Sequence, residues 1–357
     1  MRTKLGFTFA IATLGVLAAC SSSSGNSAVP GASGAAGSGG NAVAGAFPGL
    51  SMCSPAVPPS VVFTPDGSDY VNAIAVDDTR LYVGAHSVVA LPLAGGARTE
   101  LYSLTVAAWV DQLTVAGANL FAAVPTHNIH VLLALPLDAS HEPAHVAQKV
   151  GDAPFVDMGS DGSNIFYVAG PGGALGTVES SSPGGMAGAT LHSNATTIAH
   201  IVLQGTDVFL ATASGDPPSA YAVERGATSG GTTSVIATST RPILALAVNG
   251  SSVFWSESSP SPAVKRANYD GSNVALIANV SATSLAADDA SLFLTTDGKV
   301  VQVAIDSFQQ TDLAQGQIVP SAVVQRGDRV YWINGKYTDV SPPHSSNAVM
   351  SACKQHP

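Results

Sequence analysis

The segment LAVNGSSVFW, residues 246–255, carries a pattern that recurs seven times along the chain. It places an aliphatic residue, Val253, directly before an aromatic one, Phe254, with Gly250 three residues and Leu246 seven residues ahead of the aliphatic position. The seven aliphatic–aromatic pairs, spaced 38 to 45 residues apart, are Leu81 and Tyr82, Leu120 and Phe121, Ile165 and Phe166, Val208 and Phe209, Val253 and Phe254, Leu292 and Phe293, and Val330 and Tyr331. Internal repetition at this period indicates one supersecondary unit that is copied and cannot bury its apolar face alone.

Each unit predicts a β-hairpin followed by two more strands. A turn residue stands three positions before each pair: Asp78, Gly117, Gly162, Gly205, Gly250, Asp289 and Gly327. Gly and Asp favour tight turns because they reach positive φ or bond their own backbone. Expected third strands are 88–93, 130–137, 177–180, 220–224, 263–267, 300–305 and 348–353, and expected fourth strands are 99–102, 146–150, 190–192, 234–237 and 274–277. Four short strands at this period predict an all-β, seven-bladed β-propeller of four-stranded blades. A β-sandwich, the alternative, would not explain seven copies of one turn, and the repeated aromatic residues are expected to pack between neighbouring sheets.

The ends of the repeat region predict how the ring closes. The last unit supplies three strands and ends at Cys353, while a lone β-like segment, Ser60 to Thr64, precedes the first unit. An N-terminal strand that completes the last blade would remove an open sheet edge. Cys53 lies just before that segment, so a disulfide between Cys53 and Cys353 would lock the closure; two free thiols are the alternative.

The first 20 residues indicate the localisation of the protein in the cell. Arg2 and Lys4 precede an apolar run, Leu5 to Val16, and small residues follow, as in a secretory signal. Leu17-Ala18-Ala19-Cys20 resembles the lipobox of bacterial lipoproteins, which implies cleavage before Cys20 and lipid attachment to its sulfur. An ordinary signal peptide with a chance cysteine is the alternative. The expected organisation is a signal peptide over 1–19, a lipidated cysteine and Gly/Ser/Ala-rich linker over 20–50, and a propeller over 51–357.

Cysteine parity and charge agree with an exported, lipid-anchored protein of the bacterial cell envelope. Of three cysteines, lipid on Cys20 leaves Cys53 and Cys353 as a pair for an oxidising compartment. The formal net charge of −10 argues against nucleic acid as a partner and against electrostatic docking to a membrane, so the lipid must provide the anchor. The linker composition, mostly Ser, Gly, Ala and Asn, cannot bury enough apolar surface to fold.

Polar residues at the start of the expected inner strands mark a candidate ligand-binding site. The positions nine and eight residues before the repeated aliphatic residue include Asn72, Asp111, Gln112, Asp157 and His200. In a propeller these positions open on the mouth of the central channel, where neighbouring blades bring them to one pocket. Further candidates for ligand contact are Trp109, just before the second unit, and Tyr337 in the loop Lys336 to Ser346.

Metal binding is a second interpretation of the same residues. Asp111, Asp157 and His200 are of the ligand types that Ca²⁺ or Zn²⁺ accepts, although their spacing matches no recognised metal motif. His127 and His130 fall in a strand–loop region. The alternative is a set of solvated polar groups that line a wet channel, with no cofactor.

Recognised catalytic and nucleotide-binding motifs are missing from the sequence. It contains no Walker loop, no HExxH, no GxSxG and no EF-hand-like run. Val253-Phe254-Trp255-Ser256, Val330-Tyr331-Trp332-Ile333 and the segment Val264 to Gly271 resemble YWTD-type repeats of low-density-lipoprotein-receptor propellers and their bacterial relatives, without the Thr-Asp that follows the aromatic residues. The resemblance implies a propeller that binds proteins or peptides on one face.

Three functions therefore remain open. The first is a non-catalytic scaffold that binds an envelope protein or a small ligand. The second is a metal-assisted lactonase or other hydrolase with its site at the channel mouth. The third is a carbohydrate-binding ring that would use Trp109 and Tyr337 as its exposed aromatic residues.

Overall fold

The computed structural model describes the parts of the ring that follow residue 52. The described residues are 53–54, 57–66, 69–104, 108–125, 129–140, 142–150, 155–169, 176–182, 189–193, 197–215, 218–335 and 347–355. All of them belong to one unit of the chain, Ala44–Pro357. Their regular secondary structure consists of β-strands, and none of these residues forms a helix long and apolar enough to cross a membrane.

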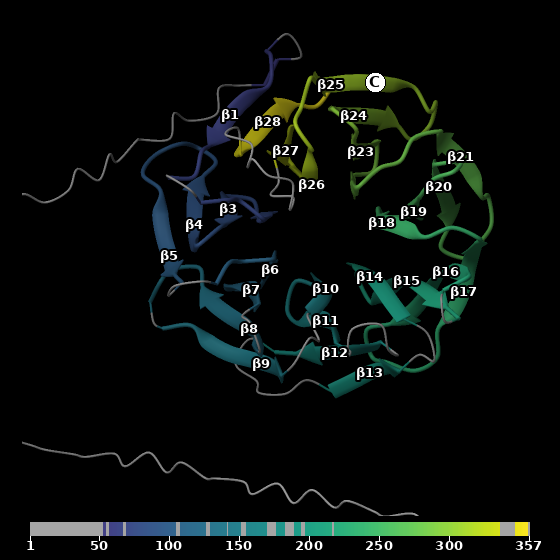
Figure 1. Ribbon diagram of the computed structural model, residues 1–357, viewed down its shortest axis with the longest axis horizontal. Helices are drawn as coiled ribbons and strands as arrows, with labels where there is room; N and C mark the ends of the chain where they lie inside the picture. Colours follow the sequence, from purple (N-terminus) through teal and green to yellow (C-terminus); the bar gives the residue numbers. More distant parts are fainter. Residues whose placement is uncertain are drawn as a thin grey trace, which may run out of the picture. The chain divides into compact units, whose positions relative to one another are not determined.

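The strands form seven four-stranded antiparallel sheets arranged as the blades of a propeller, as the repeats predict (Figure 1). In chain order the blades are β2–β5 (Ala73–Val76, Arg80–Gly84, Ser87–Pro92, Thr99–Ser103), β6–β9 (Gln112–Ala116, Asn119–Pro125, Ile129–Pro136, Ala144–Val150), β10–β13 (Phe155–Ser160, Ile165–Ala169, Thr177–Ser181, Ala189–Ser193), β14–β17 (Thr197–Gln204, Asp207–Ser214, Ala220–Ala227, Ser234–Ser239), β18–β21 (Ile243–Val248, Ser252–Glu257, Ala263–Asn268, Ala275–Ala278), β22–β25 (Ser284–Ala287, Ser291–Thr296, Lys299–Ala304, Gln310–Gln315), and β26–β28 (Ser321–Arg326, Arg329–Asn334, Ala348–Cys353) completed by β1 (Ser60–Phe63). The first strand of each blade lies innermost and contacts the first strands of both neighbouring blades, so the circuit is closed.

The repeated pair of residues holds neighbouring blades together. Adjacent residues of a strand point to opposite faces of its sheet, so the aliphatic residue faces the preceding blade and the aromatic residue faces the following one. Phe254 of the fifth blade thus shares a core cluster with Leu292 of the sixth, and Tyr331 of the seventh shares one with Leu81 of the first. Every junction between blades has the same arrangement. All seven aromatic side chains are at most 2% exposed, and each contributes roughly 1.5–3 kcal/mol by burial.

The hairpins between first and second strands use two kinds of turn. The second, fourth and seventh blades have two-residue turns that begin with a glycine at positive φ: Gly117, Gly205 and Gly327. The first, third, fifth and sixth blades have four-residue connections that begin with Asp77, Asp161, Asn249 and Asp288. In each of these, Oδ1 accepts hydrogen bonds from the backbone N–H groups two and three residues later, at 2.7–3.0 Å. The turn residue three positions before the pair is therefore only part of the signal, because an Asx side chain one position earlier closes the other four turns.

One of these aspartates illustrates the electrostatics of the turns. Burial raises the pKa of Asp161, but hydrogen bonds from the N–H groups of Asn164 and Ser163 outweigh it and hold the pKa below its ordinary value. Because its folded-state pKa is depressed, the stabilisation is present when Asp161 is ionised and is lost as the pH falls through that pKa.

One strand of the structure was not predicted from the sequence. The fourth strand of the sixth blade, β25, has the sequence QTDLAQ, in which only Leu313 and Ala314 are buried, so it lacks the apolar alternation of a half-buried strand. The third strand expected over 177–180 in the third blade is present as β12. Much of the Gly/Ser-rich segment around it, from 170 to 189, lies outside the described residues.

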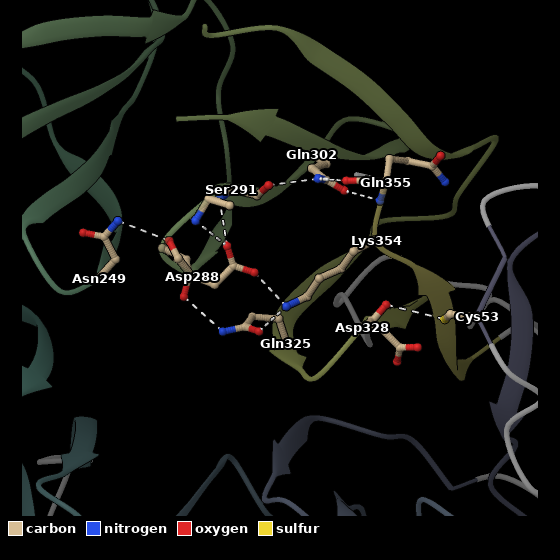
Figure 2. Close-up of polar contacts among 11 residues, drawn as sticks. Cys53, Asn249, Asp288, Ser291, Gln302, Gln325, Asp328, Lys354 and Gln355 are labelled. Atoms are coloured by element: carbon tan, nitrogen blue, oxygen red, sulfur yellow. Dashed lines mark hydrogen bonds and ion pairs between the residues drawn. The ribbon is translucent and has the colours of Figure 1, made fainter. Parts of the chain in front are cut away.

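The ring closes as the ends of the repeat region predict. Strand β1 pairs with β28, in the order β1-β28-β27-β26, and Cys53 forms a disulfide with Cys353 with a Cα–Cα distance of 5.4 Å. The chain beyond the disulfide then binds the sixth blade (Figure 2). Lys354 Nζ lies 2.7 Å from Asp288 Oδ2, while the N–H of Gln355 donates to Gln302 Oε1 at 2.8 Å and Gln302 Nε2 donates to the Gln355 carbonyl at 2.6 Å.

The disulfide makes a testable contribution to stability. It closes a loop with a sequence separation of 300 residues, for which chain entropy gives an upper limit of about 5 kcal/mol. We expect Cys353→Ser, or reduction, to lower the free energy of unfolding by a few kcal/mol, measured by urea denaturation. A Cys20→Ser variant serves as the control, since Cys20 is not part of the Cys53–Cys353 disulfide. An unchanged unfolding midpoint after complete reduction would contradict this role.

Candidate ligand-binding site

The ring has two faces, which differ in what they carry. The turn face holds the hairpin turns between the first and second strands of each blade, and the mouth face is the opposite one, at which the first strands begin. Cys353 lies at the turn-face end of β28, because it pairs with Arg329 directly after the turn Gly327–Asp328. The N–H of Lys354 donates to the Asp328 carbonyl at 2.8 Å on the same face.

A cavity of about 440 Å³ opens at the mouth face, and all seven inner strands line it. Its upper layer contains the residues nine and eight positions before the repeated aliphatic residue: Asn72, Asp111, Leu244, Thr283, Ser321, Ala73, Gln112, Asp157, His200, Ala245, Ser284 and Ala322. The structure therefore brings Asn72, Asp111, Gln112, Asp157 and His200 together at one cavity, in the register that the sequence predicts. Their role in ligand binding stays a prediction.

A collar of apolar side chains forms the floor of this mouth cavity. It contains the residue seven positions before each repeated aliphatic residue: Ile74, Leu113, Met158, Ile201, Leu246, Leu285 and Val323. A second cavity of about 290 Å³ lies toward the turn face between the third and sixth blades, and Met158, Ile201, Leu246 and Leu285 line both cavities. The collar thus stands between the two, and the mouth cavity is a cup with a polar wall and an apolar floor.

In the second blade, Asp111 lines the cup, and Trp109 lies beside Asp111 without being one of the lining residues. Val110 between them is fully buried and its N–H donates to the Ala85 carbonyl at 3.1 Å. It packs on Gly84, where an added Cβ would come within 2.7 Å of Val110 Cγ1, so this strand end needs glycine. With Val110 held inward, both neighbours are exposed, and Trp109 Nε1 donates to Asp111 Oδ1 at 2.9 Å.

Several polar residues of the wall join the inner strands of adjacent blades. Asp157 Oδ1 accepts from the N–H of Met158 at 2.9 Å, while Asp157 Oδ2 accepts from the N–H of Ile201 in the next blade at 3.1 Å and lies 3.3 Å from His200 Nδ1. Ser284 Oγ accepts from the N–H of Val323 in the next blade at 3.0 Å. These side chains have a structural role in the ring, whatever else they bind.

Gln112 belongs to the same set but keeps one group free. Its Nε2 donates to the Val156 carbonyl of the third blade at 2.7 Å. Its Oε1 is buried and has no hydrogen-bond partner among the described residues, and the same holds for Oγ of Ser321 on the other side of the first blade. Gln112 and Ser321 of the wall therefore each have a buried polar atom without a partner in the described part of the ring.

The charge of the cup is acidic. Among the described residues that line it, Asp111 and Asp157 are the carboxylates, His200 is the one imidazole, and there is no lysine or arginine. Within the ranges that the structure covers, no group of three or more His, Cys, Asp or Glu side chains is close enough to hold a metal ion. Asp157 and His200 contact each other, whereas Asp111 contacts Trp109, so the three predicted metal ligands do not share one contact.

The described structure does not place the remaining predicted residues at this cavity. Tyr337 and the rest of the loop from 336 to 346, together with His127, fall outside the described residues, and His130 lies on β8, a third strand of its blade. Ser321 and Thr283 line the cavity although they were not among the predicted ligand residues. Their register, nine residues before the repeated aliphatic position, is the signal that identifies them.

Comparison with known proteins indicates the fold and not a family. No protein-family model matches the chain, and no curated protein matches its sequence. Similar solved structures include a nidogen/laminin complex (13% identity, 68% of this chain and 98% of that chain, TM-score 0.47) and BamB from Moraxella catarrhalis (14%, 80% and 84%, TM-score 0.49). A structure from a study of two prolyl endopeptidases is also similar (13% identity, 81% of this chain, TM-score 0.56), and the chain spans only 50% of its length. At these identities the similarity concerns the fold alone.

The two carboxylates of the cup should differ in their effect on stability. Asp157→Ala removes the acceptor of two backbone N–H groups and of His200, so we expect it to lower the free energy of unfolding by about 1–3 kcal/mol. Asp111→Ala removes one bond to an exposed indole and should cost less than about 0.5 kcal/mol. Urea denaturation of both variants checks the difference, and equal losses would contradict the assignment of Asp157 as a link between blades.

Proposed function

We propose that this protein is an exported, lipid-anchored envelope protein whose ring binds a partner at the mouth cavity without catalysing a reaction. The observation that carries the proposal is the cup itself: its volume lies within the range of natural ligand sites, it combines an apolar floor with a few polar groups, and two of those groups lack partners in the described ring. A disulfide in the ring supports an oxidising compartment outside the cytosol.

The direction of the chain at the closure agrees with this function. Cys53 is fixed to Cys353 at the turn face, and β1 runs from there toward the mouth face, where Phe63 pairs with Val349. A lipid on Cys20 would therefore be connected, through residues 21–52, to the face opposite the cup. Attachment at that side leaves the mouth face available to a partner.

The lipid anchor has a direct test. Cys20→Ser removes the sulfur to which lipid would attach, so we expect the protein to lose incorporation of a palmitate analogue and to leave the membrane fraction of its cells. Cys53→Ser, a change of the same type in the ring, should keep the label. Label retained by Cys20→Ser, or lost in both variants, would contradict lipid attachment at Cys20.

The location of partner binding is tested by photo-crosslinking in intact cells. We expect a photoreactive amino acid at Val156, an exposed position of the mouth face, to give a discrete adduct. The same group at Asp306, an exposed position at the turn face, should not give that adduct. An adduct formed equally from both positions, or only from Asp306, would contradict binding at the mouth.

A further inference from the structure

We infer that the mouth cavity binds the cationic side chain of a basic protein segment, an arginine or lysine, at the side formed by Asp111 and Gln112, beside Trp109. This inference rests on the proposed function and names its ligand class. The argument combines the charge of the cup, the free acceptor capacity of Asp111, the exposed indole and the apolar floor.

The charge of the cup favours a cation. The described part of its lining has two carboxylates and no lysine or arginine, and the whole chain carries a formal net charge of −10. Asp157 is engaged by two backbone N–H groups and by His200. Asp111 is exposed and accepts one hydrogen bond, from Trp109 to Oδ1. Asp111 is therefore the carboxylate with acceptor capacity left for a ligand.

The free acceptor capacity of Asp111 favours a donor-rich ligand. Gln112, the next residue on the same inner strand, also lines the cavity, with its amide nitrogen bound to the third blade. A guanidinium has five N–H donors and an ammonium has three, and neither has an acceptor, so either can satisfy the free oxygen positions of the Asp111 carboxylate.

The indole of Trp109 completes the arrangement. It is 41% exposed, whereas the other two tryptophans, Trp255 and Trp332, are 1% and 0% exposed. Its bond to Asp111 holds an aromatic ring beside a carboxylate, and cations favour the faces of indole rings. Leu113, two residues after Asp111, belongs to the apolar collar, so the methylene stem of an arginine or lysine has an apolar surface to lie against.

Titration of the full mature protein with short peptides tests the inference. The probes are an acetylated Gly-Arg-Gly-Arg-Gly amide, the matching lysine peptide, and a citrulline peptide of nearly the same shape without charge. Fluorescence is the readout, because Trp109 is the exposed indole and Trp109→Phe identifies its share of the signal. We expect saturable binding of the arginine and lysine peptides, at least about tenfold weaker binding of the citrulline peptide, and lower affinity as salt is added.

Variants distinguish binding at the cup from nonspecific attraction to an acidic protein. Asp111→Asn should weaken binding of the arginine peptide at least about tenfold, and Asp111→Glu should restore part of it. Asp306→Asn changes the net charge equally at the turn face and should leave affinity unchanged. If Asp111→Asn does not fold, Trp109→Ala, measured by calorimetry, takes its place with the same expected loss. Equal affinity for the citrulline peptide, or affinity that Asp111→Asn leaves unchanged, overturns the inference.

Two further experiments identify the source of the cation and distinguish failure of this inference from failure of the proposed function. Arginine amide and spermidine are titrated in parallel, and binding as tight as that of the peptides would overturn the assignment to a protein segment. The adduct from Val156 is measured with and without Asp111→Asn. If the adduct persists with Asp111→Asn, the mouth face binds a partner and the cationic ligand is wrong, whereas absence of any adduct in the parent protein counts against the proposed function itself.

Discussion

The contact between the aromatic residue of one blade and the aliphatic residue of the next is the interaction on which the ring depends. It occurs seven times, and the last copy, Tyr331 with Leu81, joins the two ends of the repeat region. Because each blade has one apolar face on either side, an open arc would expose an aromatic face at one end and an aliphatic face at the other. Closure is therefore a requirement of burial. The β1–β28 pairing and the disulfide hold β1 in the seventh blade, from which the chain runs on into β2 of the first blade, and the Lys354–Asp288 ion pair joins the end of β28 to the sixth blade.

The architecture could be predicted from the sequence because every unit contains the aliphatic–aromatic pair that makes the same contact between blades. Val253 and Phe254 are recognisable beside Leu81 and Tyr82 for the physical reason that both pairs occupy equivalent blade junctions. The hairpin turns were predicted less completely, since either Gly117 at positive φ or Asp77 as an Asx acceptor produces a turn, and the sequence pattern treated them as one class. Strand β25 was missed because its burial rests on Leu313 and Ala314 alone.

For the candidate site, the place of a residue in the repeat predicted where it lies in the ring. The hydrogen bonds of its side chain determine what it can still bind. Counting back from the repeated aliphatic residue placed Asp111 and Asp157 at the same cavity. It could not show that Asp157 would be engaged by the N–H of Ile201 while Asp111 would be held by an indole, because Ile201 belongs to the next blade and the contact depends on how two sheets pack. The two carboxylates stand nine and eight residues before the aliphatic positions of their units, and they differ in chemistry.

The collar limits where the site can vary. Each of its seven side chains lines the cavity and also packs in the core between two blades, as Ile201 does between the third and fourth and Leu246 between the fourth and fifth. A larger or smaller residue there would change the packing of a blade junction, at a cost of about 1–3 kcal/mol, so the floor of the cup is fixed by the stability of the ring. In the layer above the collar, some positions are free of this constraint, since Asp111 and Thr283 are exposed. Ligand preference can therefore change at the rim of this ring without a change in its core, and the residues there that do not link blades are the ones free to determine it.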